Sequence, residues 1–259
     1  MIRVIVLFFL CVVSLSTSSY AALTFYGGKF CDSREIAFLT PEEHYAIGAH
    51  AYECGEWEEA ALQFNIVFKN FPEDPLGKRS LFFYGVSLFQ LGYFEFSDIA
   101  FSQYVAIQSH PEYFEEVIYY KFEIAEAFRK GAYRHLFGIK RLPRLLPGDK
   151  LAEEIYDEVI ALAPTSEAAV QSYYFKAFHL WNQREFKEAI LSLENLIRKF
   201  PKHELAPESY IAINQIYYDW SMYEFQNPDI LALAMINTER FERDFPSEPR
   251  VEQAQCNLL

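Results

Sequence analysis

The sequence predicts an all-α protein, an array of about five stacked helix pairs, and three observations carry this prediction. Apolar residues recur with a helical period along most of the chain, and no alternating strand pattern competes with it. Prolines end the helical runs at intervals of 39, 53, 37 and 45 residues, as stacked supersecondary units would require. An alanine lies twelve residues before four of these prolines: Ala60, Ala152, Ala189 and Ala234.

The N-terminus has the three parts of a secretory signal peptide. Residues 1–21 hold one early cation, an apolar run from Val4 to Leu15, and small residues that suit cleavage after Ala21. An N-terminal membrane anchor is the alternative, but the apolar run of about 12 residues is shorter than the roughly 20 needed to span a bilayer. We therefore expect export, with residues 22–40 as an extended lead-in to an array at 41–259.

Cys11 is the candidate lipid-bearing residue, because bacterial lipoproteins carry their lipid on a Cys that follows a Leu-x-small motif. Leu10 fits that motif poorly at the position immediately before the Cys. Cleavage near Ala21 would leave three cysteines, an odd number that gives no disulfide framework. One of them, Cys54, lies in a helical run and is expected to be buried.

The first and fourth predicted pairs share one residue pattern. Both span 32 residues, at a constant offset of 129. Each has a small residue in its first helix, Gly48 or Ala177, and an alanine in its second, Ala60 or Ala189. Small residues let two helices cross closely, while bulky apolar residues fill the space against the next unit. The pattern resembles the tetratricopeptide repeat (TPR), which implies a right-handed superhelical array of about five TPR helix pairs.

The helix ends follow from proline chemistry. The Phe-Pro steps at 71–72, 200–201 and 245–246 close three of the second helices, because proline lacks an amide hydrogen and disfavours the helical conformation of the preceding residue. We expect each Phe to enter the seam with the following helix. The predicted pairs are 41–54 with 57–71, 76–91 with 94–109, 112–130 with 150–163, 166–182 with 185–200, and 204–223 with 228–245, with a further short helix at 251–259.

The third pair contains an insertion at 131–149, which two prolines and three glycines predict to be a loop. From Arg129 to Lys150 there are seven Lys or Arg and one acid, although the whole chain has a net charge of −13. The loop is either a contact surface for an acidic partner or anionic lipid headgroups, or a solvated loop that pairs with Glu153 and Glu154. Its candidate contact residues are Arg134, Lys140, Arg141 and Arg144. Four apolar residues are expected to be buried against the array or a partner: Leu136, Phe137, Leu145 and Leu146.

An exported array of five repeats, with an enlarged third repeat containing a Phe137-Gly138 step, resembles the D component of the bacterial β-barrel assembly machinery, the BamD family. The resemblance runs from about residue 40 to the C-terminus and is strongest at 51–72 and 137–169. TPR consensus residues alone would not be specific. The combination of repeat number, export and insertion carries the resemblance.

The resemblance implies a periplasmic lipoprotein that is peripheral to the outer membrane. In that family the N-terminal repeats receive the C-terminal aromatic signal of unfolded outer-membrane proteins, and the C-terminal repeats hold the POTRA domains of the barrel-forming subunit. The lipid-bearing Cys motif of the family is a departure here, since Cys11 matches it poorly. A different periplasmic TPR adaptor, for envelope constriction or cell-wall synthesis, is the alternative. Such adaptors usually add a coiled coil, and the sequence has no heptad run.

The first helices of a TPR array line its concave surface, and here they carry a strip of aromatic residues. Such a strip suits an extended peptide with aromatic side chains, because aromatic contacts dominate interface energetics. The alternative is that the rings pack repeat against repeat. The candidate groove residues are Tyr45, Tyr52, Phe82, Phe89, Tyr174, Phe178 and Trp181.

The sequence predicts neither an enzyme nor a nucleic-acid binder. It has six scattered histidines and no HExxH, CxxC, GxSxG or glycine-rich phosphate loop, so we assign no catalytic residue, metal site or cofactor. A net charge of −13 disfavours general binding to phosphate backbones.

Overall fold

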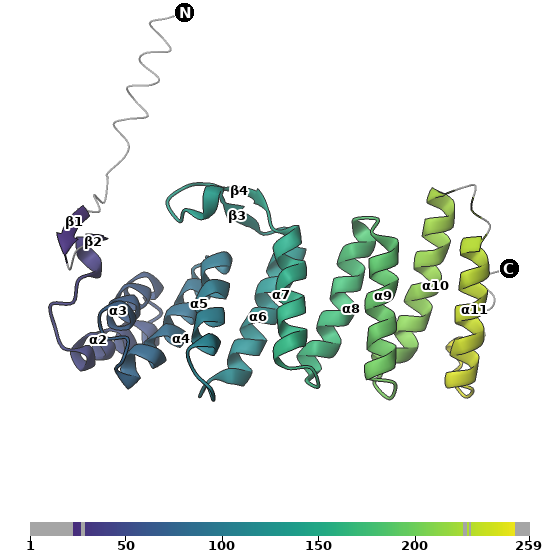
Figure 1. The fold of residues 1–259 in the computed structure, drawn as a ribbon, viewed down its shortest axis with the longest axis horizontal. Helices are drawn as coiled ribbons and strands as arrows, with labels where there is room; N and C mark the ends of the chain where they lie inside the picture. Colours follow the sequence, from purple (N-terminus) through teal and green to yellow (C-terminus); the bar gives the residue numbers. More distant parts are fainter. Residues whose placement is uncertain (1–22, 27–28, 225–226, 228, 252–259) are drawn as a thin grey trace, which may run out of the picture. The chain divides into compact units, whose positions relative to one another are not determined.

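The computed structural model describes residues 23–26, 29–224, 227 and 229–251 (Figure 1). Within these ranges ten α-helices follow one another, from α2 to α11, so the prediction of an all-α array of helix pairs is confirmed. The predicted signal peptide with Cys11, and the predicted terminal helix beyond Val251, lie outside the described residues. The described residues divide into two compact units, one ending at Ser87 and the other beginning at Leu88.

In the N-terminal unit, α2 (Pro41–Glu53) and α3 (Trp57–Asn70) form the first pair. Thr40 begins α2 with a capping box, accepting from the Glu43 amide while the Glu43 carboxylate accepts from the Thr40 amide. A Cβ added at Gly48 would lie 3.2 Å from the ring of Phe64, so only a very small residue fits where the helices cross. The close approach predicted for this pair is confirmed.

The lead-in to the array contains an antiparallel hairpin of β1 (Leu23–Tyr26) and β2 (Lys29–Asp32), in which Leu23 pairs with Asp32. A short 3-10 helix, η1 (Ser33–Glu35), follows. The Glu35 carboxylate accepts from Asn65 at 3.1 Å and pairs with Lys69 at 2.7 Å. These contacts fix the end of the lead-in on α3.

The division between the units falls inside α4 (Pro75–Gln90). The C-terminal unit continues with α5 (Phe94–Ala106), and its remaining helices pack as successive pairs (Figure 1). These are α6 (Phe114–Arg129) with α7 (Asp149–Leu162), α8 (Glu167–Asn182) with α9 (Phe186–Lys199), and α10 (Leu205–Tyr223) with α11 (Asp229–Asp244).

The repeated alanines are buried at the helix crossings. Ala60, Ala152, Ala189 and Ala234 are each 0% exposed, as the pattern predicts. Phe200 packs against a cluster that includes Val170 and Ala206, so it lies in the seam with the following helix as expected.

Two predictions are wrong. Residues 133–147 are not an irregular loop: β3 (Tyr133–His135) and β4 (Arg144–Pro147) form an antiparallel hairpin, closed by the 3-10 turn η2 (Leu136–Gly138). The prolines do not prevent it, because Pro143 lies before β4 and Pro147 ends it. Cys54 is exposed rather than buried, because it caps the C-terminus of α2 and so lies beyond the packed face of that helix.

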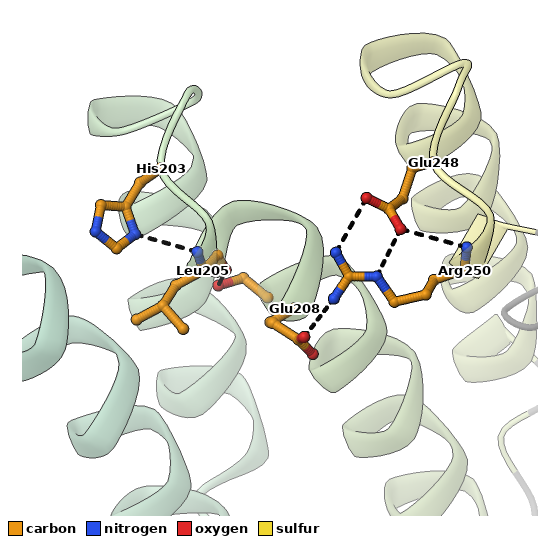
Figure 2. A network of polar contacts seen from close by, with 6 residues as sticks. His203, Leu205, Glu208, Glu248 and Arg250 are labelled. Carbon is orange, nitrogen blue, oxygen red and sulfur yellow. Dashed lines mark hydrogen bonds and ion pairs between the residues drawn. The ribbon is translucent and has the colours of Figure 1, made fainter.

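Polar contacts hold the end of the described chain against α10 (Figure 2). The Arg250 guanidinium binds the Glu248 carboxylate through Nε at 2.6 Å and Nη2 at 3.0 Å, and its Nη1 donates to Glu208 on α10. Val251 is 7% exposed and joins the core cluster of the last two pairs. Among the described residues, no helix combines the length and apolar character needed to cross a membrane.

Candidate functional site: an aromatic cleft and a basic hairpin

A cleft of about 570 Å³ opens in the C-terminal unit between α8, the start of α9 and the last turns of α10. Two of the predicted groove residues, Phe178 and Trp181, lie on its wall. A third, Tyr174, packs on Phe178 with ring centroids 4.8 Å apart. The structure therefore brings three of the seven predicted groove residues together along α8. The cleft is lined by residues that include Phe178, Trp181, Arg184, Phe186, Asp219 and Tyr223.

The aromatic wall of the cleft is held in place by polar contacts and stacking. The Trp181 indole donates to one oxygen of Asp219 at 3.0 Å, and Gln215 donates to the other at 3.1 Å. Phe186 stacks on Trp220 with ring centroids 6.0 Å apart. Rings fixed in this way lose little conformational entropy when a ligand binds, which favours recognition of aromatic or aliphatic side chains.

Two cations lie over rings at the edge of the cleft. The Arg184 guanidinium is 4.9 Å from the centroid of Tyr223, and the Lys187 ammonium is 5.6 Å from that of Trp220. Arg184 has a φ of 66°, in the left-handed region that Gly55 occupies at the equivalent turn of the first pair with a φ of 74°. An arginine at a position that favours glycine carries backbone strain, and strained residues of this kind cluster at functional sites.

Sequence reasoning missed the residues that α9 and α10 contribute. It named groove residues only from the first helices of the first, second and fourth pairs. Phe186, on a second helix, and Asp219 and Tyr223, on the first helix of the fifth pair, were therefore not among its candidates. The replacement of the turn glycine by Arg184 was visible in the sequence and could have directed attention to this end of α8.

The other predicted groove rings pack within their own units. Tyr45 contacts Phe64 and Tyr52 contacts Trp57, with centroids 5.5 and 5.3 Å apart. Phe82 is 5% exposed. In the C-terminal unit, Phe89 lies against Tyr120 and Phe94 at 5.1 and 5.5 Å. Their part in a binding groove stays a prediction.

The basic hairpin is anchored on α5 by one buried carboxylate. Glu95 is 6% exposed and accepts from both the backbone amide and the Nδ1 of His135, the latter at 2.8 Å. The Nε of Arg134 lies 3.6 Å from the same carboxylate. His135 is also in contact with the rings of Tyr93 and Phe96, at 5.5 and 5.3 Å between centroids.

Two further hairpin cations, Lys140 and Arg144, lie over the ring of Tyr93. The Lys140 ammonium and the Arg144 guanidinium lie 4.3 and 4.9 Å from its centroid. Arg144 also donates to the Leu91 carbonyl at 3.5 Å, beside Gly92, whose φ is 69°. The hairpin therefore contacts the turn before α5, whereas the predicted neighbour Glu153 accepts from Gln183.

Three of the four hairpin residues that were expected to be buried are exposed in this chain, while Leu136 is half-buried. Phe137 is 84% exposed, Leu145 61% and Leu146 38%, so the expectation that they dock against the array is wrong. His135 and Arg144 face each other where the two strands meet the turn, and their anchoring contacts leave Phe137 in the turn and Leu145 on β4 facing solvent.

Two buried ionic clusters involve α6 and α7, the helix pair that contains the β3–β4 hairpin. The Lys121 ammonium is fully buried and contacts Asp98 and Glu158 at 2.6 Å each, and Ser102 at 2.8 Å. Burial raises the pKa of Asp98 from its ordinary value, and the charge of Lys121 opposes that shift. Each group has a partner, so we interpret this cluster as structural.

The second cluster centres on Glu126, whose carboxylate accepts from Tyr156 at 2.5 Å and binds Arg129 at 2.7 Å. Burial acts to raise the pKa of Glu126, but the hydrogen bonds from Arg129, Tyr156 and Lys130 outweigh it and lower the pKa to about 2. In the part of the chain that the structure describes, no group of three or more His, Cys, Asp or Glu side chains could hold a metal ion.

The described helices form an all-helical array of stacked pairs, and the cleft opens in its C-terminal unit. No family model and no curated protein matches the chain. Several solved structures are similar to it. MamA residues 41 to the end, from Desulfovibrio magneticus RS-1, are 14% identical, with 81% of this chain and 97% of that chain covered and a TM-score of 0.41. A tetratricopeptide repeat protein from Parabacteroides merdae ATCC 43184 is 12% identical over 84% of this chain and 85% of that chain, with a TM-score of 0.43.

Proposed function

We propose that this protein is a scaffold and recognition subunit of outer-membrane β-barrel protein assembly, exported to the periplasmic face of the outer membrane. Its proposed partners are the POTRA domains of the barrel-forming subunit and the C-terminal signals of unfolded outer-membrane proteins. The resemblance of residues 51–72 and 137–169 to the BamD family supports this proposal, together with the predicted signal peptide. The structural observation that carries it is the aromatic cleft of the C-terminal unit.

The cleft has the chemistry that a peptide ending in an aromatic residue requires. Phe178, Trp181 and Tyr223 present rings to an extended chain, and Arg184 places positive charge at their edge. A peptide terminus with an aromatic side chain and a free carboxylate can use both features. Placing the signal here, rather than in the N-terminal repeats as in the family, is a departure that the experiment below addresses.

The last pair offers a surface for a folded partner. On α11 the exposed fractions of Met235 and Ile236 are 59% and 52%, and Met222 at the end of α10 is 51% exposed. Contiguous exposed apolar residues mark protein–protein interfaces. This surface supports the proposal that the C-terminal repeats hold a partner domain.

A pull-down from solubilised envelopes tests the assignment to this machinery. The tagged protein should co-purify with the barrel-forming assembly subunit. If that subunit is absent while proteins of cell division or cell-wall synthesis are recovered, the alternative of another periplasmic TPR adaptor replaces the proposal.

Peptide binding tests the cleft itself. Arg184→Gly removes the cation and relieves the left-handed backbone, so we expect unchanged or higher stability and roughly tenfold weaker binding of a peptide ending in Phe. Fluorescence anisotropy with a labelled synthetic peptide measures this change. Arg198→Ala, on the exposed face of α9, is the matched control. Equal affinities for both variants would show that the cleft does not hold the peptide terminus.

A further inference from the structure

The turn of the β3–β4 hairpin and the adjoining end of β4, residues 136–145, form the hairpin tip, which holds apolar side chains that the chain leaves uncovered. Phe137 is 84% exposed, Leu145 61% and Ile139 49%. Phe137 also has a φ of 53°, followed by Gly138 with a φ of 64°. A left-handed backbone is uncommon for a residue other than glycine. Neither burial nor backbone preference therefore explains why residue 137 is a phenylalanine.

Positive charge surrounds this apolar tip. Lys140 and Arg141 are exposed in the turn, and Arg144 begins β4. The segment from Arg129 to Lys150 has seven Lys or Arg and one acid, in a chain whose net charge is −13. An anionic surface would attract this hairpin and repel most of the remaining chain.

The hairpin is held in a defined position before any ligand arrives. Glu95 anchors His135 at 2.8 Å, and Tyr93 lies under Lys140 and Arg144. A cation over an aromatic face keeps its charge, so both side chains can still pair with anions. Because these contacts hold the hairpin in place, little conformational entropy is lost when the tip engages a surface.

We propose that the hairpin tip binds the surface of an anionic phospholipid bilayer. Phe137, Ile139 and Leu145 enter the interface between headgroups and acyl chains, while Lys140, Arg141 and Arg144 pair with headgroup phosphates. An acidic protein would satisfy the cations, but it would also need a pocket for three separate apolar side chains. A bilayer can bind the cations and the three apolar side chains without a preformed pocket. The proposal does not rest on the proposed function, because it requires only an anionic bilayer.

A tryptophan at the tip tests insertion directly. Phe137→Trp is made in the full chain, and its fluorescence is compared with that of the wild type, which has three tryptophans. With vesicles containing phosphatidylglycerol, the added signal should shift to shorter wavelength and be quenched by lipids brominated on their acyl chains. Vesicles of phosphatidylcholine alone should produce neither change.

The matched control is Leu191→Trp on α9, a position 55% exposed in the same unit but far from the hairpin in sequence. It should show no quenching, whatever the N-terminus contributes to vesicle binding. Quenching at both positions, or at neither, would overturn the proposal. A shift at Phe137→Trp with an acidic peptide but not with vesicles would instead identify a protein-docking hairpin.

Two further variants separate the apolar and charged contributions. Phe137→Asn suits the left-handed backbone, so the fold should persist while vesicle partitioning falls about tenfold. Lys140→Gln and Arg141→Gln should each weaken partitioning about fivefold at low salt. Lys202→Gln, in the turn before α10, is the charge-matched control and should leave partitioning unchanged. Equal effects of all the lysine and arginine changes would mean a general charge effect, which contradicts a specific hairpin contact.

Discussion

The third and fourth helix pairs lie side by side in the chain but have different cores. The fourth pair, α8 with α9, has small and apolar residues at its centre: Ala177, Ala189 and Leu193 are all 0% exposed. The third pair, α6 with α7, has Phe122 where the fourth has Ala177, and it buries Lys121 and Glu126 beside that ring. The same helix-pair fold can therefore have either apolar residues or paired charged residues where its two helices meet.

The difference shows what burial of charge requires. A fully buried ammonium is tolerated only when other groups compensate it, and Lys121 has two carboxylates and a hydroxyl within 2.8 Å. In the fourth pair the corresponding residue, Lys176 on α8, contacts Asp157 on α7, whose side chain is 61% exposed. Removing the lysine should therefore lower the free energy of unfolding by different amounts in the two pairs.

The largest expected effect is on the buried ammonium. Lys121→Ala leaves Asp98 buried and uncompensated, so we expect a loss of about 3–5 kcal/mol in the free energy of unfolding. Lys176→Ala, the corresponding change in the neighbouring pair, should cost less than about 1 kcal/mol because its partner is exposed. Urea unfolding of both variants measures the contrast. Similar costs would mean that the ionic core contributes no more than a surface pair.

The alanine crossing of the fourth pair comes next. Ala189→Leu adds volume at a site with 0% exposure, so overpacking should cost about 1–3 kcal/mol. Ala161→Leu, on an exposed face of α7, is the control and should change stability by less than about 0.5 kcal/mol. Thermal unfolding followed by circular dichroism compares them. A neutral Ala189→Leu would indicate that the two helices can separate at little cost.

Glu126 links the ionic core to pH. The pKa of Glu126 is lowered from 4.5 to about 2. Its contribution to the free energy of unfolding is therefore fully present above pH 4.5 and is lost as the pH falls towards 2. Glu126→Gln should cost roughly 2 kcal/mol at neutral pH, and the difference from the wild type should shrink between pH 4.5 and pH 2. Unfolding measured across this range tests the sign. A constant difference would exclude titration of Glu126 as its origin.

The smallest effect is expected at the surface. Arg240 pairs with Glu194 at 3.0 Å, and their side chains are 39% and 38% exposed. Arg240→Ala should cost less than about 1 kcal/mol, and added salt should reduce that cost. A cost that is large and insensitive to salt would show that Arg240 stabilises the structure by packing instead.

Most of the helices could be predicted from the sequence, because their period, small residues and prolines are local features. Ala60, Ala152, Ala189 and Ala234 lie where the pattern places them. The β3–β4 hairpin could not be predicted, because its strands are short and their pairing is set by contacts with Glu95 and Tyr93, far away in the sequence.

The candidate site was predicted only in part, for the same reason. Phe178 and Trp181 follow from the repeat register, whereas Asp219 and Tyr223 reach the cleft from the next pair. The burial of Lys121 was also hidden, because a lysine on a helix is normally solvated and its partners lie 23 and 37 residues away.

The residues before three prolines share one backbone geometry. Phe71 and Phe200 both have φ −129° and ψ 55°, and Ala163 has φ −132° and ψ 63°. The connection from one pair to the next therefore repeats the same backbone geometry, whereas the turns within pairs vary in length. The hairpin at 133–147 occupies such a turn. We expect an insertion of similar length after Phe200 to disturb the packing of that ring between pairs, which makes the turns within pairs the better places for grafting new binding segments.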